Sequence, residues 1–333
     1  MARALVTGIT GQDGSYLAEQ LAAEGTEVHG MVHDADPAGA EFRVGHPGVH
    51  LHAGDLADHA GLAQLVRDVE PDELYNLAGI SSVAYSWEQP ILTAELTGVA
   101  AAVLFEAALA LQEHTGRRVV CVQASSSEIF GQAARSPQDE TTPVRPVSPY
   151  GAAKAYAHHM AGVYRGKGLH VTGCILFNHE SPRRPETFVT RKITAAAARI
   201  ARDGAGTIRL GNLDARRDWG WAPDYVDAMV RAARHTVADD FVIATGETHT
   251  VAEFAEAALR RAGVGDAWQS HVEVDPALFR PLDATVMVGD ASKARRELGW
   301  APGVGFAELV GRMVDHDLEL LATRPATGSG APA

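Results

Sequence analysis

Residues 3–19 read RALVTGITGQDGSYLAE, and this stretch decides the fold. Its first five residues, 3–7, form an apolar run typical of a buried strand, and a helical pattern follows the glycines. Gly8, Gly11 and Gly14 separate the two elements as G-x-x-G-x-x-G. Such glycines permit a tight turn, a close approach of backbone to a diphosphate and close packing of helix on strand, while the helix N-terminus offers unpaired N–H groups. The stretch predicts the first strand–helix junction of a dinucleotide-binding sheet.

The rest of the N-terminal half repeats this alternation of strand and helix. Further strands are expected at residues 27–32, 49–52, 73–77 and 118–123, and helices at residues 14–24, 59–69 and 91–114. Alternation of this kind predicts an α/β fold with a doubly wound parallel sheet and helices on both faces. Right-handed crossovers then place the loops after the strands along one edge, where ligands bind. Asp55 after the third strand and Leu77, Ala78 and Gly79 after the fourth strengthen the dinucleotide interpretation over that of a simple tight turn.

The rhythm changes after about residue 176, where prolines divide the chain into shorter pieces. Helices are expected around residues 189–201 and 251–262. We therefore expect a dinucleotide-binding domain over residues 1–176 and a smaller substrate-binding lobe over 177–322, interleaved with the first. The small, polar tail over residues 323–333 is expected to be disordered.

Composition excludes several classes of function. The 333 residues are 46% hydrophobic and 21% charged, and 42 Asp and Glu against 29 Lys and Arg give a net charge of −13. This balance argues against nucleic-acid or anionic-membrane partners. The apolar run over residues 99–105 is far shorter than the roughly 18 residues of a membrane span. With no signal-peptide pattern and two cysteines in apolar strand-like runs, we expect a cytoplasmic protein.

Tyr150 and Lys154 form a candidate acid–base pair in the segment SPYGAAKA. Ser148 and Pro149 are typical of a helix start, and the i, i+4 spacing places both side chains on one helix face. An ammonium near a phenol favours the phenolate, so we expect Lys154 to lower the pKa of Tyr150 towards the working range of a base. Only four lysines occur in the chain, which makes coincidence at this spacing improbable.

A second acid–base candidate follows the fifth strand, in the segment ASSSEIFG over residues 124–131. The end of a strand faces the ligand crevice in a doubly wound sheet, where hydroxyls such as that of Ser126 can hold a substrate oxygen. Glu128 would add a carboxylate within reach of the substrate, separate from the tyrosine. The alternative is a solvated loop acid. The pair His179–Glu180 suggests a zinc helix, but no second histidine follows at i+4, so we predict no catalytic metal.

Seven stretches together resemble the GDP-mannose 4,6-dehydratases, which are enzymes of the extended short-chain dehydrogenase type with a Rossmann fold. These stretches are ALVTGITGQDGSYLAE, ASSSEIFG, SPYGAAKAYA, LFNHESPRR, FVTRKI, GNLDARRDWGWAPDYVDAM and FVIATGETHTV. The resemblance covers most of the chain. It implies a nicotinamide-dependent lyase that converts GDP-mannose to GDP-4-keto-6-deoxymannose, with the cofactor retained and recycled.

The resemblance also implies a role for each matching residue. Tyr150 is the base on the sugar 4-hydroxyl, Lys154 tunes it, Glu128 takes the C5 proton, and Ser126 stands where the family has threonine. The implied cofactor-binding residues are Gly8, Thr10, Gly11, Gln12, Asp13, Gly14, His33, Asp34, Asp55, Leu56, Leu77, Ala78, Gly79, Tyr150, Lys154, His179 and Arg184. The implied substrate-binding residues are Ser81, Ser86, Glu128, Asn178, Lys192, Gly211, Arg217 and Arg280.

The end of the second strand departs from the family. His33 and Asp34 stand where the family has an arginine pair for the 2′-phosphate of NADP. Asp34 lies 20 residues beyond Gly14, where an acid usually accepts from a free ribose hydroxyl, so these residues favour NAD over the family's NADP. The alternative is that Asp34 turns outward and that Arg43, or a cation from another loop, holds the 2′-phosphate, which leaves NADP open. The short stretch over residues 35–40 replaces one that joins dimers in the family, which favours a homodimer over a homotetramer.

Other functions remain open on the sequence. One alternative is a GDP-sugar reductase or epimerase of the same fold, which needs no C5 base and so no Glu128. Another is a non-catalytic nucleotide-sugar sensor, a class that typically lacks the tyrosine–lysine pair. Ile80, Ser82 and Trp87 also depart from the family near the expected hexose pocket, which leaves room for a modified GDP-hexose.

Overall fold

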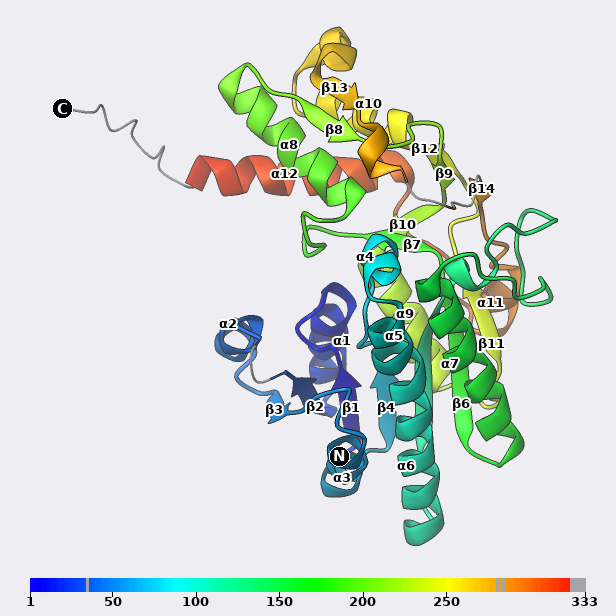
Figure 1. Ribbon diagram of the computed structural model, residues 1–333. Helices are drawn as coiled ribbons and strands as arrows, with labels where there is room; N and C mark the ends of the chain where they lie inside the picture. Colours follow the sequence, from blue (N-terminus) through cyan, green and yellow to red (C-terminus); the bar gives the residue numbers. More distant parts are fainter. Residues whose placement is uncertain (34–35, 280–281, 283–285, 324–333) are drawn as a thin grey trace.

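The fold is that of a computed structural model, which describes residues 1–33, 36–279, 282 and 286–323. Its centre is a seven-stranded parallel sheet in the order β11-β6-β5-β4-β1-β2-β3 (Figure 1). The strands are β1 Arg3–Thr7, β2 Glu27–Val32, β3 His50–Ala53, β4 Glu73–Asn76, β5 Val120–Ser126, β6 His170–Leu176 and β11 Asp240–Ile243. The predicted fold class, an α/β doubly wound parallel sheet, is confirmed. Almost all of the expected tail lies outside the described residues.

Helices cover both faces of this sheet (Figure 1). Helices α1 Gln12–Ala23 and α9 Ala222–Ala233 pack together on one face, and α3 His59–Val69, α6 Ala100–Thr115 and α7 Pro149–Gly166 pack on the other. Leu17, Tyr225 and Met229 belong to the buried cluster under the first pair. Leu104 and Phe105 belong to the cluster under the second set. Because these helices bury their apolar faces against the sheet, the loops at the strand ends are not part of the core and can carry polar groups.

The long apolar helix expected over residues 91–114 has three parts. They are α5 Pro90–Thr93, the π-helix η1 Ala94–Val99 and α6. A Cβ on Gly98 would lie 3.3 Å from the Ala153 carbonyl oxygen, so η1 packs closely against α7. Our expectation about membrane spans needs a correction, because the continuous helix Pro90–Thr115 is long and apolar enough to cross a membrane. Of its most apolar window, 56% is buried inside the protein, as in the core helix of a sheet protein.

The second half of the chain builds a smaller lobe above the carboxyl ends of the strands (Figure 1). Helices α8 Val189–Asp203, α10 Val251–Arg261 and α12 Phe306–Thr323 pack around a separate buried cluster that includes Trp219 and Phe254. Short strands complete it: β7 Asn178–Glu180 pairs with β10 Trp219–Trp221, and β8 Ile208–Leu210 with β13 Val272–Val274. In the sequence, α9 and β11 lie between the strands of this lobe but belong to the main sheet, which α9 covers and β11 extends. The domain boundary at residue 176 stays a prediction.

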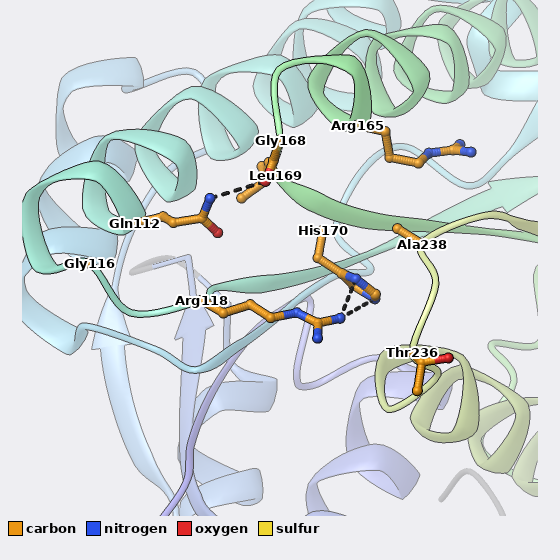
Figure 2. A pocket seen from close by; sticks show the side chains of 9 residues that line it. All are labelled: Gln112, Gly116, Arg118, Arg165, Gly168, Leu169, His170, Thr236 and Ala238. Atoms are coloured by element: carbon orange, nitrogen blue, oxygen red, sulfur yellow. Dashed lines mark hydrogen bonds between the residues drawn. The ribbon is translucent and has the colours of Figure 1, made fainter.

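A hollow lies at the amino ends of β5 and β6, at the end of the sheet opposite to the smaller lobe (Figure 2). It has a volume of about 480 Å³, and the ends of α6 and α7 border it. Arg118 contacts the ring of His170, and Gln112 donates to the Gly168 carbonyl oxygen at 3.1 Å (Figure 2). The lining residues are Gln112, Gly116, Arg118, Arg165, Gly168, Leu169, His170, Thr236 and Ala238.

Candidate active site

The glycine junction has the shape that a dinucleotide diphosphate requires. Gly8 has φ +72°, and a Cβ there would lie 2.9 Å from the Ala78 backbone nitrogen. A Cβ on Gly14 would lie 2.2 Å from the Gly8 carbonyl oxygen, so a side chain would push α1 away from the loop. Helix α1 begins at Gln12 with Gly11 as its N-cap and has no side-chain cap. Its first N–H groups are therefore available to an anion, which fits the diphosphate of a nicotinamide dinucleotide.

A cavity of about 400 Å³ opens beside this junction, at the carboxyl ends of β4, β5 and β6. It brings together thirteen of the predicted residues: Asp13, Leu77, Ser81, Ser126, Glu128, Tyr150, Lys154, Asn178, His179, Arg184, Lys192, Gly211 and Arg217. The other predicted residues that the structure describes do not line it: Gly8, Thr10, Gly11, Gln12, Gly14, His33, Asp55, Leu56, Ala78, Gly79 and Ser86. Asp34 and Arg280 lie outside the described residues.

Tyr150 is held in the first turn of α7. Ser148 caps this helix by accepting a hydrogen bond from the Gly151 N–H at 3.0 Å, and Pro149 occupies its first turn. The Tyr150 N–H donates to the Ser86 hydroxyl at 3.1 Å, and that hydroxyl donates to the Val83 carbonyl oxygen at 2.7 Å. Ser86 is fully buried, so it orients the tyrosine backbone and does not reach the cavity where the resemblance placed it.

The electrostatics of the tyrosine–lysine pair differ from the sequence-based expectation. Burial raises the pKa of Tyr150 to about 12, the hydrogen bond with Ser126 lowers it, and the charge of Glu128 raises it. Lys154 does not produce the expected lowering, because its ammonium donates to the Ala124 carbonyl oxygen at 2.8 Å and lies 5.9 Å from the centre of the Tyr150 ring. Burial also lowers the pKa of Lys154 to about 8. Displaced pKa values of this kind gather at functional sites.

Glu128 lies beside the tyrosine because two elements meet there. It is in the short 3-10 helix η2 Ser127–Ile129, which Ser126 caps by accepting from the Glu128 N–H at 3.2 Å. A Cβ on Gly151 would lie 2.6 Å from the Glu128 carbonyl oxygen, so only glycine lets α7 approach this closely. Glu128 and Tyr150 therefore line one cavity, as the sequence predicted.

Besides Lys154 and Arg184, three more cationic side chains line the cavity. Lys192, from α8, donates to the Arg209 carbonyl oxygen at 2.6 Å, and Arg217, in β9 Arg216–Arg217, donates to the Arg216 carbonyl oxygen at 2.9 Å. Sequence reasoning missed the third, Arg209, whose side chain lies 3.0 Å from Asp275. Its only sequence signal is the alternation in β8, where buried Ile208 and Leu210 flank it. Guanidinium and ammonium groups gathered in this way suit a diphosphate.

Three residues expected near the cavity depart from the family sequence, and one of them lines it. Ser82 lines the cavity, and its hydroxyl caps α4 Val83–Glu88 by accepting from the Tyr85 N–H at 3.2 Å. Ile80 and Trp87 are not among the lining residues. Of the three changes, Ser82 alone stands on the cavity wall.

Metal chemistry finds no ligand set in the described part of the chain. Within residues 1–33, 36–279, 282 and 286–323, no group of three or more His, Cys, Asp or Glu side chains is arranged to hold a metal ion. The His179–Glu180 pair instead makes protein contacts. Arg184 donates to Glu180 at 3.0 Å, and the Thr190 hydroxyl donates to the same carboxylate at 2.6 Å.

Solved structures define the class of protein to which this fold and cavity belong. A UDP-glucose 4-epimerase from Thermus thermophilus in complex with NAD superimposes with a TM-score of 0.81 at 29% identity, over 95% of this chain and 98% of that one. A dTDP-glucose 4,6-dehydratase from Streptomyces venezuelae with NAD bound gives 0.80 at 26%, over 94% and 96%. The chain thus has the fold of the sugar-nucleotide epimerases and dehydratases of the short-chain dehydrogenase type.

Sequence comparison narrows the class to one family. The model of the GDP-mannose 4,6 dehydratase family matches residues 5–313. GDP-mannose 4,6 dehydratase 1 of Arabidopsis thaliana is 47% identical over 95% of this chain and 90% of that protein, and the Vibrio cholerae enzyme is 41% identical over 96% and 94%. The chain belongs to the GDP-mannose 4,6-dehydratase family and is a hydro-lyase, as the sequence motifs predicted.

Proposed function

We propose that the cavity binds GDP-mannose and converts it to GDP-4-keto-6-deoxymannose. The observation that carries this proposal is the placement of a carboxylate, Glu128, beside Tyr150 and Lys154 in one cavity. Oxidation at C4 needs one base, whereas removal of the C5 proton needs a second, and an epimerase or reductase of this fold needs only the first. The cluster of Lys192, Arg209 and Arg217 supplies the charge that a nucleotide diphosphate requires.

Four residues of the cavity have roles in this reaction. Tyr150 accepts the proton of the 4-hydroxyl, and Ser126 holds the same oxygen through its hydroxyl. Lys154, whose ammonium donates to the Ala124 carbonyl oxygen at 2.8 Å, would hold the cofactor, the second role that the resemblance implies for this residue. The 4-keto group acidifies C5–H, so the Glu128 carboxylate can take that proton and deliver a proton to the 6-hydroxyl that leaves as water. A nicotinamide dinucleotide held at the glycine junction would supply hydride transfer from C4 and back to C6, and with a proton returned to C5 the reaction would have no net redox change.

The test is direct. Purified protein incubated with GDP-mannose is analysed by mass spectrometry, and loss of one water from the sugar nucleotide is expected. A product of unchanged mass would indicate an epimerase, and a change that depends on added reduced dinucleotide would indicate a reductase. Binding without conversion would indicate a sensor. GDP-hexoses that differ at C2 or C3, offered in competition, measure the tolerance that Ser82 confers.

We propose further that the cofactor is NAD. Beyond the sequence argument from Asp34, the described residues near this end of the loop include two carboxylates. Asp36 accepts from the Thr10 hydroxyl at 3.0 Å, and Asp55 lies 3.7 Å from the His33 ring. Carboxylates repel a 2′-phosphate and accept from a free 2′-hydroxyl. Denaturing the purified protein and identifying the released dinucleotide tests the proposal, and recovery of NADP alone would contradict it.

We also propose a homodimer that forms through the helices on one face of the sheet. Tyr156 and Val163 lie one helical heptad apart on α7 and are 46% and 54% exposed. Ile91 and Val99 on the neighbouring α5 and η1 are 82% and 38% exposed. An apolar stripe of this kind on two packed helices fits a second copy of the same surface. Light scattering should give the mass of a dimer for the wild type and a smaller mass for Val163→Lys. An unchanged dimer mass in the variant, or a tetramer in the wild type, would contradict this assembly.

For the compartment, we propose the cytoplasm. Both cysteines, Cys121 and Cys174, are buried and unpaired, and burial raises their pKa values well above the usual range, so neither is a reactive thiolate. Fractionation of the source cells with an antibody to this chain tests the proposal, and recovery in the membrane fraction would contradict it.

A further inference from the structure

Both ring nitrogens of His179 face hydrogen-bond acceptors. Nδ1 lies 2.7 Å from the Phe177 carbonyl oxygen, and Nε2 lies 2.9 Å from a carboxylate oxygen of Asp13. A carbonyl oxygen only accepts, and so does an ionised carboxylate. A neutral imidazole has a single N–H and can satisfy one of these contacts but not both. With Asp13 ionised, only the doubly protonated ring donates to both acceptors.

Asp13 is ionised in this arrangement. Burial alone would raise the pKa of this carboxyl group, but the charge and hydrogen bond of His179 and the charge of Arg184 hold it at about 2. The side chain of Asp13 also accepts from the Gln12 amide at 3.0 Å. The contact between Asp13 and His179 is thus a charge-assisted hydrogen bond of a carboxylate with an imidazolium.

The surroundings of His179 suit a buried cation. His179 is only 7% exposed, and its ring stacks on Tyr225 of α9 with 4.6 Å between ring centres. An aromatic face attracts a cation through its quadrupole. The nearby Arg184 pairs with Glu180 at 3.0 Å and adds to the positive charge that keeps Asp13 ionised, whereas the imidazolium makes the direct contact with Asp13.

The pair joins two parts of the molecule that are far apart in the sequence. Asp13 lies in the first turn of α1, directly after the glycine junction, and His179 lies in β7, which leads into the smaller lobe. The same two segments are joined again where Gln12 donates to the His179 carbonyl oxygen at 3.1 Å and accepts from the Ser181 hydroxyl at 2.9 Å. Asp13 and His179 both line the cavity between them.

We propose that His179 is a positioning residue, a buried imidazolium that holds the first segment of the smaller lobe against the dinucleotide loop. The pair sets the distance between the two walls of the cavity, and the wall residues on each side depend on it. The consequence for ligand binding rests on the proposed function, whereas the charge state of His179 does not.

The charge state is tested by NMR of the full chain with isotope-labelled histidine at neutral pH. The resonances of His179 are identified by their absence from His179→Gln. Both ring nitrogens are expected at the positions of protonated nitrogens in the wild type, and this signature is expected to be lost in Asp13→Asn. A neutral tautomer of His179 in the wild type would overturn the proposal.

The positioning role is tested with a matched pair of variants. His46 makes the same two kinds of contact, with the Phe42 carbonyl oxygen at 3.0 Å and with Glu19 at 3.1 Å, but it is not part of the cavity lining. His179→Gln keeps a donor to Asp13 without the charge, and we expect it to weaken NAD binding about tenfold in a thermal-shift titration. His46→Gln should leave that titration unchanged.

Two further outcomes are informative. Equal effects of His179→Gln and His46→Gln on NAD binding would overturn the positioning role, because they would show a general effect on stability. A wild type that shows the imidazolium signature but binds neither NAD nor NADP would contradict the proposed function and leave the charge state of His179 established.

Discussion

Two hollows lie at opposite ends of the strands of the main sheet, one at the carboxyl ends (the carboxyl edge) and one at the amino ends (the amino edge). Both are lined with charged side chains, yet they are built differently. At the carboxyl edge, Tyr150 and Lys154 meet Glu128 beside the N-termini of α1 and α7. At the amino edge, Arg118 contacts His170 where α6 and α7 end (Figure 2). Helix N-termini attract anions and helix C-termini do not. The comparison teaches that the direction of the helices, more than the mere presence of charge, separates a ligand site from a structural hollow.

Displaced pKa values occur in both hollows, so they do not discriminate by themselves. Burial raises the pKa of Tyr150 to about 12 at one edge, and burial with the charge of Arg118 lowers that of His170 to about 4 at the other. At the carboxyl edge an acid–base pair shares a cavity with a cation cluster. The amino edge has no carboxylate among its lining residues in the part of the chain that the structure describes.

The largest effect is expected from Glu128→Gln. The amide preserves the shape of the side chain but has no basic oxygen for the C5 proton, so dehydration should fall by roughly 10²- to 10⁴-fold. The rate is measured by using mass spectrometry to monitor the loss of water from GDP-mannose over time. Glu113→Gln, an exposed carboxylate at the amino end of the sheet, serves as the control and should retain full activity. Full activity of Glu128→Gln would contradict its assigned role.

Arg217→Ala comes next. Loss of a guanidinium from the cation cluster should weaken binding of free GDP about tenfold or more, because a charge-assisted contact to the diphosphate is lost. Calorimetry with GDP measures the affinity, and the dinucleotide content of the purified variant should not change. Arg216→Ala is the neighbouring control, since Arg216 donates to Thr248 at 3.1 Å and is not among the lining residues. Identical GDP affinity in Arg217→Ala and the wild type would show that the arginine does not bind diphosphate.

At the amino edge, His170 should affect stability and not turnover. Its folded pKa of about 4 lies below its ordinary value of 6.5, so the unfolded chain takes up the proton first as the pH falls. Stability is therefore greatest above pH ~6.5 and is lost as the pH falls towards ~4. The full shift corresponds to roughly 3 kcal/mol, and solvent screening of this partly buried ring reduces the expected loss to about 2 kcal/mol. Urea unfolding across this window should show a smaller loss in His170→Asn. An equal loss in both proteins would assign the acid sensitivity to other groups.

The smallest effect is expected from Arg118→Ala. Turnover and GDP affinity should match the wild type, and stability at neutral pH should change by less than about 0.5 kcal/mol, because the side chain is exposed. The charge of Arg118 lowers the pKa of His170, so its removal should make the acid loss of stability smaller. A large fall in turnover would break the comparison and make the second hollow part of the functional machinery.

Much of the fold and the candidate site follows from the sequence. The strands at residues 3–7 and 27–32 and the helix at residues 59–69 have the predicted bounds, because local patterns of apolar residues specify them: short apolar-rich runs for the strands and helical spacing for the helix. The spacing of Tyr150 and Lys154 places both on one wall of the cavity. The π-helical turn over Ala94–Val99 was not predicted, since it depends on the close approach of α7 at Gly98.

The sequence by itself determined the class of sheet, the glycine junction and the identity of the two candidate bases, because each depends on residues only a few positions apart. The tertiary structure alone decided that Ser86 supports the Tyr150 backbone and that Lys154 turns to the Ala124 carbonyl oxygen. It alone placed His179 opposite Asp13, 166 residues earlier in the chain. Contacts over such distances depend on how whole elements pack, and hydrogen-bond partners and burial then set the charge of each group.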